Sequence, residues 1–383
     1  MPSDTNAANL NPNLTASSLQ HARSPLYGGA LNSVLEAARR SSPKVGAKVG
    51  AGDVAVLGAG AWGTALAIAL ARKSETKATG EVRLWARREA HVAAMRAAGV
   101  NEERLPGCAF PASLSATEDM SAALSGASVV LLAATSSGTE DVAVAAAEHA
   151  EPGAALILCA KGLAKDGGLL ADAVARVWRG GPVLVLSGPS FADEVAQDLP
   201  TIVTLAGENA ALYAARLSSA RFVVCPSADL AGVQIAGVFK NVAATLCGAA
   251  DGIGAGANAR AALMSEAMRE ASGLIAALGG DIATLLGPAG FGDFALTCTD
   301  AKSRNYSFGR DLATGAHKSK LGKTHEGMAN VATLLRLADE AGVDAPLAAA
   351  VADLVAGRVD AEGAIAAAFD WRRSRVRELA RAA

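Results

Sequence analysis

The sequence predicts an α/β protein in which a doubly wound sheet is followed by an all-helical C-terminal domain. Three observations support this prediction. A glycine-rich turn, GAGAWG at residues 58–63, joins a short apolar run to a segment with helical spacing. Apolar runs of strand length then alternate with helix-like segments as far as residue 188, which is typical of a sheet covered on both faces. From residue 227 the pattern is helical with few strand signals.

The length of 383 residues is sufficient for two domains with a sizeable buried core. We expect a flexible N-terminal extension at 1–52, a nucleotide-binding domain at 53–226 and a helical substrate-binding domain at 227–383. The extension is rich in Ser, Asn, Ala and Pro and lacks an apolar signal core, so a disordered tail is favoured over a targeting segment. Within it, LNSVLEAARRSS is compatible with one short helix.

The composition excludes several classes of protein. With 51% hydrophobic and 19% charged residues the chain is globular, and a net charge of -2 gives no basic footprint for nucleic acid. The five cysteines are odd in number and never spaced as CxxC, which argues against disulfides and zinc and favours a reducing, cytoplasmic location. The histidines have no metal-ligand spacing, and no uninterrupted apolar run reaches the ~20 residues that cross a bilayer.

The segment DVAVLGAGAWGTALAIALARK (53–73) has the order strand, glycine turn, helix that a dinucleotide site requires. Gly58 permits the turn, Gly60 lets the backbone approach a pyrophosphate, and Gly63 lets helix and strand pack closely. A second strand, EVRLWARR (81–88), follows at the distance of a Rossmann-type βαβ unit, although the turn could also serve packing alone.

The end of that second strand bears on the choice of cofactor. An NAD-selective site usually places an acid there, whereas arginines accommodate a 2′-phosphate. This sequence has Arg87 and Arg88 and no acid, so NADP is favoured, with NAD as the other cofactor.

Further strands are expected at 127–135, 154–161 and 181–188, and ligands bind beyond the carboxyl ends of such strands. Lys161 and Gly188 lie at these ends. Lys161 is either an anion or carbonyl contact or a solvated lysine. Ser190 to Asp193 fits a capping box, so Ser190 could serve only as a helix cap.

Lys240 is the only strongly ionisable residue in LAGVQIAGVFKNVAATLCGAA (230–250). On a helix it shares a face with Gly237 and Ala244, which we expect to leave room for a small substrate. A lysine in so apolar a segment reaches water, finds a partner or loses its proton through a lowered pKa. The first of these outcomes would give Lys240 no functional role.

Successive blocks of the chain, in order, resemble the bacterial type of NAD(P)-dependent glycerol-3-phosphate dehydrogenase. The blocks are GAGAWGTALA, LPGCAFPASLSAT, AKGL, SGPSFADEVAQDLPT, VFKNVAA, DGIGAGANARAAL, GPAGFGDFALTCTDAKSRNYSFGR and HEGMAN. The resemblance covers nearly all of the chain except the N-terminal extension. It implies an oxidoreductase that interconverts sn-glycerol 3-phosphate and dihydroxyacetone phosphate with a nicotinamide cofactor and supplies glycerol 3-phosphate for phospholipid synthesis. A homodimer is common in the family.

The resemblance also implies roles for individual residues. Lys240 would be the proton donor and acceptor, assisted by Lys161 and Asp293. The substrate contacts would be Lys161, Gly188, Ser190, Lys240, Asp293, Thr297, Ser303, Arg304 and Asn305, with Arg304 at the phosphate. The cofactor contacts would be Gly58, Gly60, Ala61, Trp62, Gly63, Arg87, Arg88, Lys161, Ala192, Arg304 and Glu326.

The chain departs from the family at two places. The family commonly has a proline near Ala134 or Thr135, and an apolar residue where Thr324 stands. Neither departure affects the proposed acid–base residue.

Two alternatives stay open: another two-domain dehydrogenase, acting on a β-hydroxy acid or a nucleotide sugar, or a non-catalytic NADP-binding sensor. The dehydrogenase prediction requires Lys161, Lys240, Asp293 and Arg304 to converge in one cleft.

Overall fold

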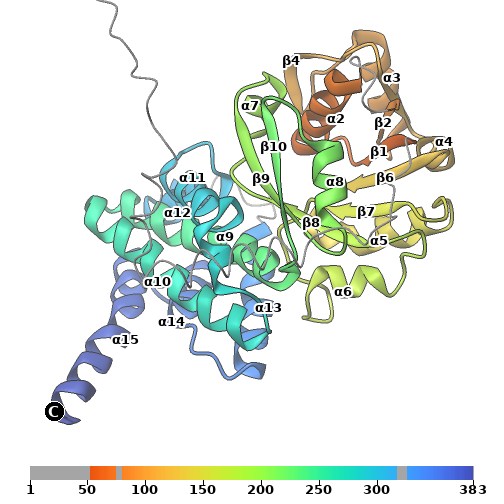
Figure 1. Ribbon diagram of the computed structural model, residues 1–383. Helices are drawn as coiled ribbons and strands as arrows, with labels where there is room; N and C mark the ends of the chain where they lie inside the picture. Colours follow the sequence, from red (N-terminus) through yellow and green to blue (C-terminus); the bar gives the residue numbers. More distant parts are fainter. Residues whose placement is uncertain (1–51, 75–79, 317–325, 383) are drawn as a thin grey trace, which may run out of the picture.

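The computed structural model describes residues 52–74, 80–316 and 326–382. Residues 1–51 of the predicted N-terminal extension, which include its short helix, and Thr324 lie outside the described residues. Within the described part, a sheet with flanking helices precedes a group of helices, as predicted (Figure 1). The last strand of the sheet ends at Ser227 and the first long helix begins at Leu230. The predicted division between residues 226 and 227 falls in the last two residues of that strand and stays a prediction.

The main sheet has eight strands in the order β10-β9-β8-β7-β6-β1-β2-β5. Every neighbouring pair is parallel except β8 and β9, which are antiparallel. The strands are β1 (Asp53–Leu57), β2 (Val82–Trp85), β5 (Leu114–Thr117), β6 (Ala127–Leu132), β7 (Ala155–Leu158), β8 (Val183–Ser187), β9 (Thr201–Ala206) and β10 (Phe222–Ser227). The sequence did not predict β5, β9, β10 or the antiparallel pair, nor the separate hairpin of β3 (Val100–Asn101) and β4 (Leu105–Ala109).

Apolar runs form the central strands because both faces of the sheet are covered. In β1, Val54 and Val56 pack into a core with α2, α3 and α8, whereas Ala55 and Leu57 pack on the other face with α4, α5 and α6. The covering helices are α2 (Ala61–Ser74), α3 (Glu89–Ala98), α4 (Met120–Leu124), α5 (Ser136–Ala147), α6 (Leu170–Ala175) and α8 (Ala210–Leu217). A strand that is buried on both faces is stabilised by apolar side chains at every position. These strands therefore do not alternate between apolar and polar residues.

The helical part is built around α9 (Leu230–Gly252), which is buried at every position from Gly232 to Ala250. By length and composition α9 could cross a membrane, but 89% of its apolar window is buried inside the protein, as in a core helix. The surrounding elements are α10 (Gly256–Ala277), η2 (Ile282–Leu286), η3 (Pro288–Gly292), α11 (Asp293–Thr299), α12 (Arg304–Ala313), α13 (Glu326–Glu340), α14 (Pro346–Val355) and α15 (Ala361–Ala382). The sequence has helical spacing at 229–251 and 257–279, and these two segments form α9 and α10.

Two glycines let α12 pack against the backbone of α9. A Cβ on Gly248 would lie 1.9 Å from the carbonyl oxygen of Tyr306, and a Cβ on Gly309 would lie 1.8 Å from that of Thr245. No side chain larger than hydrogen fits at either position, so this contact fixes the place of α12 along α9. The N-terminus of α12, where the predicted phosphate contacts begin, is thereby fixed relative to the helix that carries Lys240.

The capping box predicted at Ser190 is wrong. The short helix α7 (Ala192–Ala196) begins after Phe191, and no side chain caps it. The hydroxyl of Ser190 instead donates to the carbonyl oxygen of Gly188 at 3.0 Å, which stabilises the turn that follows β8. The five cysteines are free, and the described residues contain no group of acids, cysteines and histidines that could hold a metal ion.

Candidate active site

Lys161 lies just beyond the carboxyl end of β7, where the sheet meets the helical part. Its Nζ donates to the carbonyl oxygen of Gly188 at 3.1 Å, and Gly188 directly follows β8. Because β7 and β8 are parallel neighbours, their carboxyl ends open on the same edge of the sheet. A second hydrogen bond runs from Lys161 Nζ to Asp293 Oδ2, at 2.6 Å, and joins this edge to α11.

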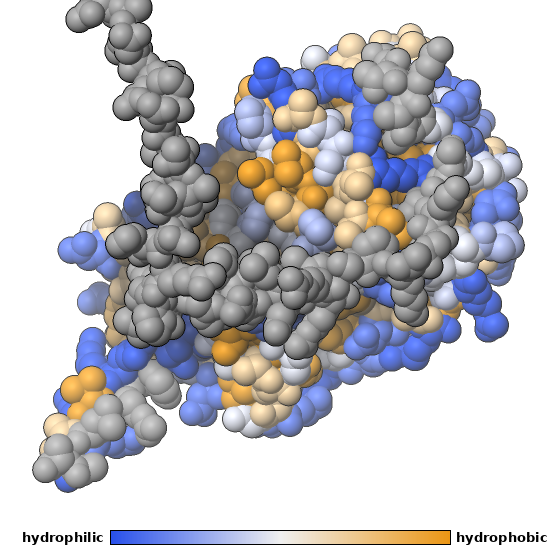
Figure 2. Space-filling view, viewed as in Figure 1, coloured by the Kyte–Doolittle hydropathy of each residue, from blue (hydrophilic) through white to orange (hydrophobic). Residues whose placement is uncertain are grey.

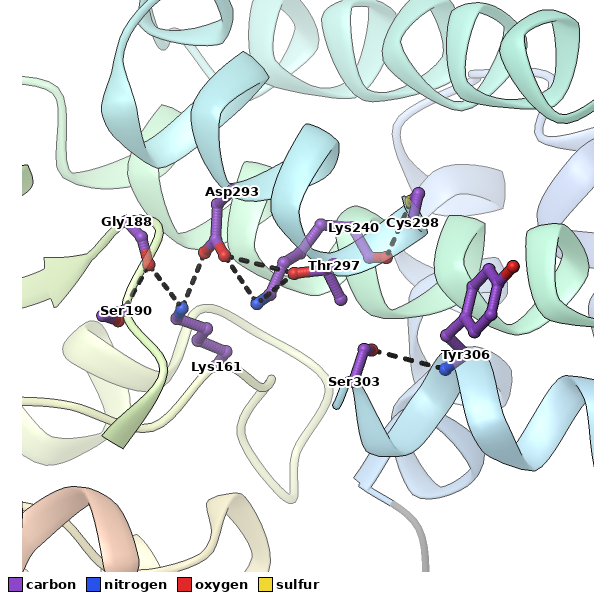
Figure 3. A network of polar contacts seen from close by, with 9 residues as sticks. All are labelled: Lys161, Gly188, Ser190, Lys240, Asp293, Thr297, Cys298, Ser303 and Tyr306. Carbon is purple, nitrogen blue, oxygen red and sulfur yellow. Dashed lines mark hydrogen bonds and ion pairs between the residues drawn. The ribbon is translucent and has the colours of Figure 1, made fainter. Parts of the chain in front are cut away.

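Lys240 reaches the same carboxylate from the core helix α9 (Figure 3). Its Nζ donates to Asp293 Oδ1 at 2.7 Å and to Thr297 Oγ1 at 2.9 Å. Asp293 and Thr297 are four residues apart on α11, so one turn of that helix supplies both acceptors. The lysine therefore has partners for its charge and does not extend to the surface. This excludes the possibility, left open by the sequence, that Lys240 only reaches water and has no functional role.

The charges of this cluster do not balance, because two ammonium groups share one carboxylate. The Asp293 side chain is 1% exposed and that of Lys240 10%. Burial lowers the pKa of Lys240 to about 8, and the charge of Lys161 adds to this effect while Asp293 opposes it. Burial on its own raises the pKa of Asp293, but the two lysines outweigh burial and the net pKa lies below its ordinary value. The cluster thus attracts electron-rich oxygens and holds a lysine that can exchange a proton near neutral pH.

Each ammonium group keeps one donor available. An ammonium has three N–H bonds, and within the described part of the chain Lys161 and Lys240 each use two of them. The two ammonium groups bind the two oxygens of one carboxylate. A free N–H from each of them can bind a single oxygen of a small molecule. The arrangement suits a carbonyl oxygen that becomes an alkoxide, because both donors are charged.

The expectation that Gly237 and Ala244 leave room for a substrate is wrong. A Cβ on Gly237 would lie 3.3 Å from Ser187 Oγ and 3.4 Å from Lys161 Cγ, so this glycine accommodates the aliphatic stem of Lys161. Ala244 is fully buried in the helical core. Ser187 was not identified from the sequence. Its hydroxyl is buried beside the Lys161 stem without a hydrogen-bond partner among the described residues.

The predicted phosphate contacts lie at the N-terminus of α12. Ser303 is buried and caps the helix, since its hydroxyl accepts from the backbone N–H of Tyr306 at 3.3 Å. Arg304 is the first residue of α12 and is exposed, and Asn305 is half-buried. A helix N-terminus with an arginine suits a phosphate group.

Lys302 joins this segment to the sheet part. Its Nζ binds Asp193 and Glu194 of α7, at 3.0 Å each, and lies 5.4 Å from the ring centre of Phe191. Ala192, a predicted cofactor contact, is the first residue of α7. This link could not be predicted from the sequence, because Lys302 is more than a hundred residues from its partners.

The glycine turn fits the diphosphate of a dinucleotide. Gly58 has φ +116, and a Cβ there would lie 2.8 Å from the carbonyl oxygen of Ala133. A Cβ on Gly63 would lie 1.9 Å from the Gly58 carbonyl oxygen, whereas Gly60 has nothing within 4 Å. Gly58 and Gly63 therefore permit the turn, and the backbone at Gly60 is open to a ligand. Ala61 and Trp62 begin α2 beside it and are half-buried.

The two arginines beyond β2 have different surroundings. Arg87 is exposed, and among the described residues it has no hydrogen-bond or ion-pair partner. Arg88 forms an ion pair with Glu103, at 2.5 Å. The sequence placed no acid here, because Glu103 comes from the β3–β4 hairpin and not from the end of β2. The last predicted cofactor contact, Glu326, is the first residue of α13, and its side chain lies outside the described part.

Comparison with known proteins identifies both parts of the chain. Residues 53–213 match the family model of the N-terminus of NAD-dependent glycerol-3-phosphate dehydrogenase, and residues 229–366 match the model of its C-terminus. The chain is similar to glycerol-3-phosphate dehydrogenase (NAD(P)+) of Halorhodospira halophila, at 43% identity over 324 residues, 82% of this chain and 96% of the relative. The corresponding enzyme of Mesorhizobium japonicum is 42% identical over 318 residues, 82% of this chain and 91% of the relative.

Solved structures give the same result. The crystal structure of glycerol-3-phosphate dehydrogenase from Coxiella burnetii is similar with a TM-score of 0.76 at 37% identity, over 82% of this chain and 97% of that chain. The glycerol-3-phosphate dehydrogenase structure from Saccharomyces cerevisiae has a TM-score of 0.72 at 24% identity, over 82% and 99% of the two chains, and shows the shared fold.

Proposed function

Because the chain belongs to the NAD-dependent glycerol-3-phosphate dehydrogenase family, we propose that Lys240 exchanges a proton with the substrate oxygen in the family reaction. The protein is an NAD(P)-dependent oxidoreductase that interconverts sn-glycerol 3-phosphate and dihydroxyacetone phosphate. In the reducing direction it supplies glycerol 3-phosphate for phospholipid synthesis. The single observation that supports the role of Lys240 is its shared carboxylate with Lys161.

Reduction of a ketone requires a hydride for the carbon and a proton for the oxygen. When bound, the nicotinamide supplies the hydride, and the glycine turn Gly58–Gly63 with Arg87 would hold the dinucleotide. Lys240 supplies the proton. Its pKa of about 8 gives both protonation states near neutral pH, so it can also accept the proton in the oxidising direction.

Lys161 and Asp293 assist in different ways. The free N–H of Lys161 would donate to the substrate oxygen and stabilise the negative charge that develops there. Asp293 holds both ammonium groups at 2.6 and 2.7 Å, and so fixes the direction of their remaining donors. Thr297 holds Lys240 from the same turn of α11. Lys161 belongs to the sheet part, whereas Lys240, Asp293 and Thr297 belong to the helical part. The donors are therefore positioned by the packing of one part on the other.

The phosphate end of the substrate would lie at the N-terminus of α12. Arg304 would offer paired N–H donors to phosphate oxygens, and Asn305 would add a polar contact. Gly188 and Ser190 remain predictions as substrate contacts, as do Ala192, Arg304 and Glu326 as cofactor contacts. In the structure the Gly188 carbonyl accepts hydrogen bonds from Lys161 and Ser190, so these residues already orient one another.

The test is a steady-state assay of dihydroxyacetone phosphate reduction with NADH and NADPH, alongside β-hydroxy acids and nucleotide sugars. We expect turnover of the triose phosphate alone. Comparable turnover of a β-hydroxy acid or a nucleotide sugar would favour the first alternative, and cofactor binding without turnover would favour the sensor.

We further propose a cytoplasmic homodimer. Ile202 of β9 and Val223 of β10 are neighbours in register and are exposed, by 48% and 38%. β10 is the edge strand of the sheet, and Figure 2 shows hydrophobic residues gathered over this part of the surface. An exposed apolar patch at a sheet edge is a common interaction surface. Sedimentation equilibrium tests the dimer, and a monomer at all concentrations would contradict it.

A further inference from the structure

The tip of the β3–β4 hairpin carries an acidic residue between two arginines. The Nη2 of Arg88 donates to both carboxylate oxygens of Glu103, at 2.7 and 2.5 Å. Arg104 Nη2 lies 2.9 Å from Glu103 Oε1. The hydrogen bond from Arg88 lowers the pKa of Glu103, so its carboxylate is charged at neutral pH. One acid therefore engages two of the three arginines in this region, and Arg87 is left exposed.

The base of this hairpin is attached to the glycine turn. Asn101, which is buried, donates from Nδ2 to the carbonyl oxygen of Ala59 at 3.1 Å and to Thr64 Oγ1 at 2.7 Å. Its Oδ1 accepts from His91 Nε2 at 2.9 Å, because an amide oxygen carries no hydrogen and can only accept. Ala59 lies inside the glycine turn and His91 lies on α3. Glu103, two residues beyond Asn101, is thereby held at a fixed place relative to the turn.

Arg88 occupies the place where dinucleotide folds distinguish their cofactors. Arg88 lies between β2 and the N-terminus of α3. The strand β2 is the parallel neighbour of β1, and β1 leads into the glycine turn. In folds of this kind the end of the second strand faces the adenosine ribose, where an acid accepts the 2′-hydroxyl and an arginine binds a 2′-phosphate. Here both an acid, Glu103, and an arginine, Arg88, are present, and they are paired with each other.

We propose that Glu103 is a specificity-determining residue that weakens the binding of a cofactor with a 2′-phosphate relative to one with a free 2′-hydroxyl. A 2′-phosphate carries about -1.5 to -2 charges. It would meet a carboxylate of the same sign and an arginine whose Nη2 already donates to that carboxylate. A ribose hydroxyl meets neither penalty and can donate to the carboxylate. The inference rests on the proposed function, specifically on cofactor binding at the glycine turn.

The test compares Glu103→Gln with the unsubstituted protein. Glutamine keeps the size of the side chain and removes its charge, so Arg88 and Arg104 lose the carboxylate that both of them contact. We measure binding of 2′,5′-ADP and 5′-ADP by calorimetry, and kcat/KM with NADPH and NADH. The expected result is about a tenfold rise in the affinity ratio of 2′,5′-ADP to 5′-ADP, equivalent to ~1.4 kcal/mol, with a parallel rise in the NADPH to NADH ratio.

Glu118→Gln is the matched control. Glu118 pairs with Arg96 of α3 at 3.1 Å and is similarly exposed, so a general loss of acidic charge would affect both variants alike. When Arg88 is also replaced, in the double variant Arg88→Met, Glu103→Gln, the change in the affinity ratio should be smaller. Glu103→Gln acts by releasing Arg88, and in the double variant that arginine is absent. An unchanged ligand ratio in Glu103→Gln, or an equal change in Glu118→Gln, would overturn the proposal. If the unsubstituted protein bound neither ligand, the cofactor site itself would be wrong and this inference with it.

Discussion

The Nζ of Lys240 lies 2.7 Å from Oδ1 of Asp293, although the two residues are 53 positions apart in the sequence. The other oxygen of the same carboxylate binds Lys161, which is 132 positions away and belongs to the sheet part. The cluster therefore exists only when the sheet and the helices are packed together. Each of the predictions below depends on this packing or on the charges that it brings together.

Replacing Lys240 by methionine should reduce turnover by about 10² to 10⁴-fold, the usual contribution of a positioned acid or base. Methionine fills a similar space without the ammonium group, so cofactor affinity should change little. The measurements are kcat for dihydroxyacetone phosphate reduction and the Kd of NADH by fluorescence titration. Lys165→Met, at an exposed lysine paired with Asp141, is the control. A kcat within a factor of two of the unsubstituted enzyme would remove Lys240 from the mechanism.

The pH dependence should report the titration of the cluster. Reduction requires the ammonium form of Lys240, so kcat/KM for dihydroxyacetone phosphate should be constant up to about pH 8 and fall above it. Oxidation of glycerol 3-phosphate requires the free amine and should rise with pH up to the same value. Measurements begin at about pH 7, because the second pKa of a phosphate monoester is near 6.

Lys161→Met should move this profile in a known direction. Removing the charge of Lys161 removes one of the causes that lower the pKa of Lys240, so the midpoint should shift to higher pH. The lysines and Asp293 titrate as a coupled group, and the observed midpoint belongs to the cluster. A profile unchanged by Lys161→Met would show that the two ammonium groups do not interact.

Asp293→Asn should destabilise the fold, by about 3–5 kcal/mol, because the buried ammonium group of Lys240 and the half-buried one of Lys161 lose the carboxylate that they share. The pKa of Asp293 is lower in the folded state than its ordinary value. Its ionised form therefore contributes stability above the ordinary pKa, and that contribution is lost as the pH falls through the folded pKa. The free energy of unfolding in urea should differ most between the two proteins at neutral pH. A difference that grew as the pH was lowered would contradict this assignment.

Arg304→Ala should raise KM for the phosphorylated substrates by about 10- to 100-fold, as expected for the loss of hydrogen bonds from a charged donor. The value of kcat should change less, because the phosphate does not react. Arg310→Ala, at an exposed arginine on the same helix, controls for the loss of positive charge. Equal effects of the two substitutions would assign the change to general electrostatics.

The sequence predicted the elements of the fold better than their pairing. The order strand, glycine turn, helix at 53–73 and the long helices α9 and α10 were predictable, because glycine chemistry and apolar periodicity are local properties. β9 and β10 were missed although TIVTLA and FVVCPS are rich in β-branched residues. Both strands have six residues, as many as β6, so their length was not the reason. The antiparallel pairing of β8 with β9 is set by the tertiary fold and has no local signal.

The same distinction holds for the candidate site. Lys161 and Lys240 are recognisable because each is a single charge in an apolar segment, and Asp293 follows a glycine-rich block. That one carboxylate binds both lysines is a long-range contact that spacing does not encode. Glu103 was missed for the same reason, since 15 residues separate it from Arg88. The space at Gly237 was predicted, but its occupant is the Lys161 stem, which only the structure shows.

Gly248→Ala tests whether the close contact of α9 with α12 positions the substrate. An added Cβ would lie 1.9 Å from the Tyr306 carbonyl oxygen, and backbone cannot move aside as a side chain can. The helices must therefore separate, at a cost of about 1–3 kcal/mol or more. Separation would displace the N-terminus of α12, so KM for the phosphorylated substrate should rise along with the fall in Tm.

Gly273→Ala in α10 is the matched control. Its Cβ would lie 3.2 Å from Cγ1 of Val343, a single side-chain contact that can adjust, and alanine favours helix over glycine. We expect Tm to change little in this variant and KM to stay the same. If Gly248→Ala lowered Tm without changing KM, the glycine contact would stabilise the fold but would not position α12. If it changed neither, the two helices would be able to separate at no cost, which the backbone contact at Tyr306 argues against.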